Sequence, residues 1–73
     1  MAHTVAELEV ANRHLAEGVR CVTEQRRRIA EQVRTGRDTG LSTRVLKTFE
    51  DTLQLLLEHR DIILRDQAQN KDS

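Results

Sequence analysis

The sequence has no proline, tryptophan or tyrosine, and it has one phenylalanine and one cysteine. Because proline is the residue that most strongly breaks a helix interior, its absence allows long uninterrupted helices. The single cysteine, Cys21, excludes an internal disulfide framework and suits a reducing cytosol. Twelve basic residues balance twelve acidic ones, so no net charge attracts nucleic acid or an anionic membrane.

Long apolar runs are also absent, and no stretch reaches the length of a signal peptide or a membrane span. We therefore expect a cytoplasmic protein that does not associate with a membrane. The 73 residues make one domain at most, and a chain this short is marginally stable by itself.

The residues that are abundant, chiefly Leu, Val, Ala, Arg, Glu and Gln, mostly favour helices. Thr4 and Glu7 form a capping box, and a heptad pattern follows without a break, which predicts a helix over about 4–35. Gly36 stands where a left-handed residue ends a helix. Asp38 or Thr39 caps a second helix over about 39–66, followed by a polar tail at 67–73. This pattern predicts an all-α protein, an antiparallel two-helix hairpin. The seam between the helices is expected at heptad positions a and d: Leu8, Leu15, Val19, Val22, Ile29, Val33, Leu46, Phe49, Leu53, Leu56 and Ile63.

The corner at 36–40 contains two of the three glycines, and a glycine-rich loop can also cradle a phosphate. The phosphate-binding loop G-x-x-x-x-G-K-[ST] needs a preceding strand and a lysine. Here the spacing between Gly36 and Gly40 is one residue too short, and Leu41 stands in place of the lysine. We interpret the segment as a helix–helix corner, where Arg37 could at most hold an anion weakly.

The second helix carries more apolar surface than one partner helix covers. A further row of residues, the outer stripe, lies away from the seam: Leu41, Val45, Thr48, Thr52, Leu55, His59 and Ile62. A helix that is apolar on two sides is usually buried on two sides. We therefore expect a homodimer, a four-helix bundle of two hairpins, with a domain-swapped form as an alternative; the pattern leaves parallel and antiparallel arrangements open. The expected dimer interface is Leu41, Val45, Thr52, Leu55, His59, Ile62, Gly18 and Cys21.

Polar residues at seam positions are expected to fix the register. Antiparallel spacing places Arg26 near Glu50 and Arg60 near Glu17. The alternative is that each arginine extends to water.

Candidate chemical sites are weak. His14, Glu17 and Cys21 share one helix face, but His14 and Cys21 lie about 10 Å apart along the helix axis, too far to ligate one metal ion. The sequence therefore predicts no metal, no cofactor and no enzyme. The run Arg26–Arg28 could touch phosphate, yet acidic residues stand four positions away on the same helix, and no aromatic side chain is near to stack a base.

The segments "HLAEG" from His14, "GRDTG" from Gly36 and "LKTFEDTLQLLLEHRDIIL" from Leu46 resemble a group of short alphaproteobacterial proteins. These share a G-x-D-T corner and an L-x-T-F-E-x-T-L pattern, and the resemblance implies a helical hairpin of unknown function, with no family active site to carry over to this sequence. The architecture is also similar to that of Rop, a plasmid regulator that binds RNA as a dimer of hairpins.

Our hypothesis from the sequence is a small dimeric helical module that acts through protein contacts, with itself as one partner and an unidentified protein as another. The alternative is a Rop-like RNA-binding regulator, and a metal-dependent or thiol enzyme ranks third. A basic face made of Arg20, Arg27, Arg28 and Arg34 would favour the RNA hypothesis, whereas mixed charge there would oppose it.

Overall fold

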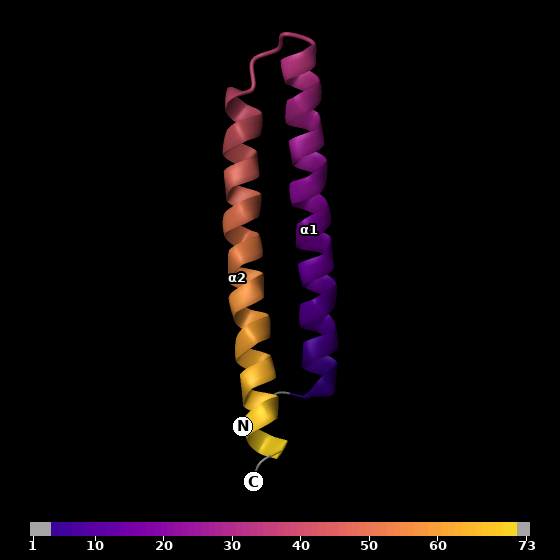
Figure 1. Cartoon of the computed structure of the whole chain (residues 1–73), viewed down its shortest axis with the longest axis vertical. Helices are drawn as coiled ribbons and strands as arrows, with labels where there is room; N and C mark the ends of the chain where they lie inside the picture. Colours follow the sequence, from indigo (N-terminus) through magenta and orange to yellow (C-terminus); the bar gives the residue numbers. More distant parts are fainter. Residues whose placement is uncertain (1–3, 72–73) are drawn as a thin grey trace.

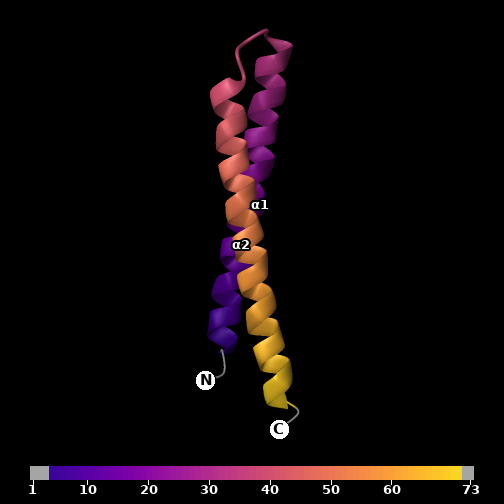
Figure 2. The same ribbon diagram turned by 90° about the vertical axis from the view of Figure 1, so that its left-hand side faces the viewer.

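Two long antiparallel helices make up the computed structural model of the chain, which describes residues 4–71. Helix α1 spans Val5–Arg34 and helix α2 spans Gly40–Lys71. They run side by side from the corner to the open end, where the ends of the chain lie (Figure 1), and they cross at a shallow angle (Figure 2). The predicted all-α hairpin is thus confirmed.

The hairpin is thin and elongated. Its extents are 59 × 15 × 14 Å and its radius of gyration is 16.8 Å, whereas a compact chain of this length has a radius of gyration of about 11 Å. Only Ala11, Val22, Gln25 and Ile63 are buried among the described residues. The two helices therefore enclose a core that is a single row of side chains wide.

Helix α1 is capped by its own neighbours at both ends. The Thr4 hydroxyl accepts a hydrogen bond from the Glu7 amide at 3.1 Å, as the capping box predicts. At the other end, Gly36 has φ +74°, and the amides of Gly36 and Arg37 donate to the carbonyls of Val33 and Gln32. This pair of bonds is a Schellman motif, which ends a helix through a left-handed residue.

Helix α2 begins at the corner and continues further than expected. The Gly40 amide donates to the Asp38 carboxylate at 2.9 Å, so Asp38 satisfies one of the unpaired donors of the first turn. We expected the helix to end near 66, but residues 67–71 are helical, and 72–73 lie outside the described residues. Gln67 is half-buried and donates to the Thr4 carbonyl at 3.2 Å, which fixes this part of α2 to the start of α1.

The seam matches the expected positions on α2 and is shifted on α1. On α2, the residues at a and d are buried or half-buried: Leu46, Phe49, Leu53, Leu56 and Ile63. On α1, the d residues Leu8, Leu15, Val22 and Ile29 are likewise buried or half-buried, and so are the g residues Ala11, Gly18, Gln25 and Gln32. The assignment of Val19 and Val33 to the seam was wrong, because their side chains are 47% and 66% exposed.

Close packing explains why α1 turns its g positions toward α2. A Cβ atom on Gly18 would lie 3.1 Å from a methyl of Leu56 and 3.3 Å from a methyl of Leu53. Gly18, which we assigned to the dimer interface, therefore belongs to the hairpin's own seam. Near the corner, the Gln25 side chain donates to the Ser42 carbonyl at 2.9 Å, which satisfies a polar group inside the seam.

The positive φ of Gly36 predicts that replacing this glycine destabilises the corner. A residue with a Cβ atom is strained in the left-handed region by about 1–2 kcal/mol, whereas asparagine tolerates it better. We expect Gly36→Val to lower the melting temperature clearly and Gly36→Asn to lower it much less. Circular dichroism melts of the two variants at equal concentration test this, and equal melting temperatures would show that the corner does not need a left-handed residue.

Candidate interaction surface

The hairpin has two broad faces, because the seam lies between them. We call one the histidine face; it holds His14 and Cys21 of α1 and the outer stripe of α2. The other is the arginine face, where Arg26 and Arg60 reach from one helix to the other. The two faces differ in how their charges are arranged.

The arginine face is bridged by polar side chains. Arg26 forms an ion pair with Glu50 at 3.0 Å, which confirms that expected pairing. Arg60 instead donates to the Asn12 side-chain oxygen, so its expected pairing with Glu17 was wrong: Asn12 stands at the same level on α1 and on the same face. Between the two bridges, a shallow groove of about 330 Å³ is lined partly by Val19, Leu53 and Leu57.

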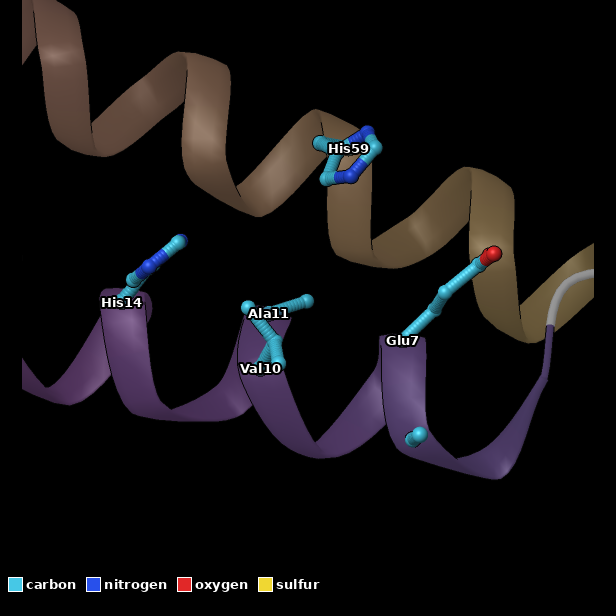
Figure 3. A pocket seen from close by; sticks show the side chains of 6 residues that line it. Glu7, Val10, Ala11, His14 and His59 are labelled. Carbon is cyan, nitrogen blue, oxygen red and sulfur yellow. The ribbon is translucent and has the colours of Figure 1, made fainter.

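The histidine face has two grooves that run between the helices. At the open end, a groove of about 470 Å³ lies between Val10, Ala11 and His14 of α1 and His59 of α2, and Figure 3 shows the two histidines facing it from opposite helices. Halfway along, a groove of about 380 Å³ is lined by residues of both helices: His14, Glu17, Gly18, Cys21, Thr48, Phe49, Thr52 and Leu56. Residues of both helices therefore contribute to this face.

The outer stripe is exposed along most of its length. Leu41, Leu55 and Ile62 are 76%, 65% and 56% exposed; Thr48, Thr52 and His59 are exposed and Val45 is half-buried. Cys21, also expected at the dimer interface, is a free exposed thiol. The structure thus places Thr48 and Thr52 of the outer stripe in one groove with Cys21, while Gly18 lies in the seam against Leu53 and Leu56.

The outward side of α1 carries mixed charge. Arg27 and Arg28 both pair with Glu24, at 2.7 and 3.5 Å, and Arg34 pairs with Glu31 at 2.6 Å. The hydrogen bonds from Arg27 hold the pKa of the Glu24 carboxyl below its ordinary value, and those to Glu24 raise the pKa of Arg27. Arginines recur at 13, 20, 27 and 34 and glutamates at 17, 24 and 31, so a ladder of alternating sign runs along α1 and no purely basic face forms.

No side-chain cluster suited to metal binding appears within residues 4–71. No group of three or more His, Cys, Asp or Glu side chains there could hold a metal ion. None of the helices in this range is both long and apolar enough to cross a membrane.

Comparison with known families, curated proteins and solved structures finds no match for this chain. The architecture implied by the resemblance to short alphaproteobacterial proteins and to Rop is present in the hairpin. The family relationship itself remains a hypothesis.

The ligand geometry predicts that the protein binds no metal stoichiometrically. His14 and Cys21 are two turns apart on α1, which exceeds the reach of ligands that must each lie about 2 Å from one ion. Elemental analysis of protein purified without chelators tests this. About one zinc or iron per chain would contradict it, and His14→Ala would show whether that metal is held on the histidine face.

The mixed charge on α1 predicts no tight RNA or DNA binding. Arg27 and Arg28 are already paired with Glu24, and affinity for nucleic acid depends on cations that are available to phosphates. We expect no gel shift at micromolar protein and roughly physiological salt. A shift that Arg27→Glu with Arg28→Glu abolishes, and that Lys47→Glu on α2 leaves intact, would restore the RNA-binding hypothesis.

Proposed function

We propose that this protein is a homodimeric interaction module, a four-helix bundle in which the histidine faces of two hairpins pack together. Its excess surface carries the proposal. The chain exposes 5795 Å² for a mass of 8.4 kDa, whereas a compact monomer of that mass exposes about 4,600 Å². The excess of about 1,200 Å² exceeds the roughly 800 Å² that each partner buries in a standard interface.

The kind of surface left exposed supports the same proposal. A lone hairpin covers one stripe on each helix, and the outer stripe has no use in it. Leu55 and Ile62 are more than half exposed, although burying such a side chain stabilises a protein by about 1.5–3 kcal/mol. Rows of exposed apolar residues of this length commonly mark interfaces.

The histidine face is the better dimer surface because the outer stripe of α2 contains no Asp, Glu, Lys or Arg. A partner on the arginine face would have to cover Val19 and Leu57 and also the Arg26–Glu50 pair, and removing an ion pair from water is unfavourable. That face is more suitable for remaining in contact with solvent or for a second, more polar partner.

The role that follows is structural or regulatory. A dimer of this design presents four helix surfaces and no deep concave pocket of the kind that enzymes use. We propose that it acts as an accessory module whose arginine faces and charge ladders contact other proteins. The RNA-binding alternative finds no support in the arrangement of arginines on α1.

Two double variants test which face forms the dimer. Leu55→Glu with Ile62→Glu places four unpaired carboxylates in each dimer, and each costs several kcal/mol when buried. We expect light scattering to show a monomer with reduced helical circular dichroism. The matched control, Val19→Glu with Leu57→Glu on the arginine face, should remain dimeric.

The wild type should itself be dimeric, and its melting temperature should rise with protein concentration, as mass action requires when folding and association are coupled. A monomeric wild type would refute the homodimer. A dimer that the control variant disrupts, and that the Leu55 and Ile62 variant does not, would move the interface to the arginine face.

A further inference from the structure

The exposed row on α2 can be laid on a reversed copy of itself. Leu41, Thr48, Leu55 and Ile62 occupy every seventh position, so they lie on one line along the helix. The midpoint of this row falls between residues 51 and 52. When a second copy of α2 is laid on the first in reverse, Leu41 meets Ile62, and Leu55 packs against the methyl-bearing side chain of Thr48.

Two-fold symmetry allows two ways of stacking the same face of two hairpins. If the axis runs along the helices, α2 of one copy lies on α1 of the other, at the same level and with the corners at the same end. If the axis runs across the helices, α2 lies on α2 and α1 on α1, each pair antiparallel, with the corners at opposite ends. The two arrangements differ in whether the apolar side chains of α2 face the charged side chains of α1 or face α2 again.

Helix α1 offers a polar edge where α2 offers an apolar one. Glu17 lines the same groove as Leu56 and Thr52, so it stands at the level of Leu55. With the axis along the helices, Leu55 of one copy would press on Glu17 of the other, and Thr48 would press on Glu24. Covering the Glu17 carboxylate with an apolar side chain removes it from water without supplying a cation, which is unfavourable. With the axis across the helices, the outer row of α2 faces the same row of the other copy, and the carboxylates of α1 face α1 instead of that row.

The structure thus assigns the dimer an antiparallel arrangement; we infer that its two-fold axis crosses the histidine face at the level of Thr52 and Cys21. This inference rests on the proposed homodimer and gives its partner a defined orientation and register. Thr52 and Cys21 line one groove, so the middle of the apolar row and the thiol of α1 lie at the same height. The axis therefore brings Cys21 of one copy opposite Cys21 of the other.

The surroundings of Cys21 suit this contact. Cys21 is itself small and exposed, and small side chains let helices approach to about 8 Å between axes. Glu24 would face Glu17 of the other copy, but its charge is already offset by Arg27 and Arg28. The α1 pair therefore brings the two Cys21 side chains together near the axis, while the α2 pair contributes most of the apolar burial.

Oxidative cross-linking of the full-length chain tests the arrangement. Copper phenanthroline in air lets dioxygen take two electrons and two protons from two Cys21 thiols, which join as one disulfide. Disulfides require Cα atoms within about 7 Å, a distance met across the axis of the antiparallel dimer. In the other arrangement the two Cys21 residues are on diagonal helices, which lie about 13 Å apart for neighbours at 8–10 Å. We expect a covalent dimer on non-reducing gels, and none with Cys21→Ser.

The rate identifies a disulfide formed within the dimer. Association raises the effective thiol concentration from micromolar toward millimolar, so linking should be about a hundredfold or more faster than in the monomeric Leu55→Glu and Ile62→Glu variant. An equal rate in both proteins would show that the link forms by random collision and would overturn the inference.

A second pair of positions checks the register independently. In a Cys21→Ser background, Leu41→Cys mixed with Ile62→Cys should give a cross-linked heterodimer, whereas each variant alone should give little. If light scattering finds a dimer and neither the Cys21 link nor the mixed link forms, the homodimer stands and the antiparallel arrangement is wrong. If light scattering finds a monomer, both fail.

Discussion

The constraint on which the rest depends is that two helices can bury only one row of side chains between them. Val22 and Ile63 are almost fully buried, and few of their neighbours are. Ordering a chain of this length is opposed by more conformational entropy than such a narrow core easily offsets. The close approach at Gly18, the capped ends of α1 and the polar bridges on the arginine face all stabilise the pair. The proposed second copy widens the core from two helices to four.

The hairpin and its corner were predictable because they depend on local signals. The capping box at Thr4 and the glycine at 36 act within one turn of chain, and both form the bonds that their positions require. The face that α1 turns inward was harder to predict. Val19 has the expected character for the seam, yet the small side of α1 at Ala11 and Gly18 allows α2 to come nearer. The close approach of the two helices therefore decided which face of α1 is buried, and the pattern of apolar residues in the sequence does not reveal that distance.

The candidate site shows the same division. The outer stripe could be predicted from sequence periodicity alone. The structure adds that most of its side chains are exposed in the hairpin. The Arg26–Glu50 pair followed from counting back across the corner. The partner of Arg60 did not, since Glu17 lies on the other face of the rotated α1 and Asn12 takes its place. Because α1 is rotated so that its g positions face α2, the polar residues that meet across the seam differ from those expected. The buried positions of α2 are the a and d positions that the sequence predicts.

The charge ladder on α1 has a consequence for the order in which the chain acquires structure. Its rungs are local, since Arg27 binds Glu24 and Arg34 binds Glu31 within a single turn, and the helix is closed at both ends by residues no later than Arg37. Every one of these bonds is available before α2 has been synthesised. During translation, α1 can therefore form helical turns by itself and offer α2 a surface on which to fold. The first half of the chain then acts as a template for the second.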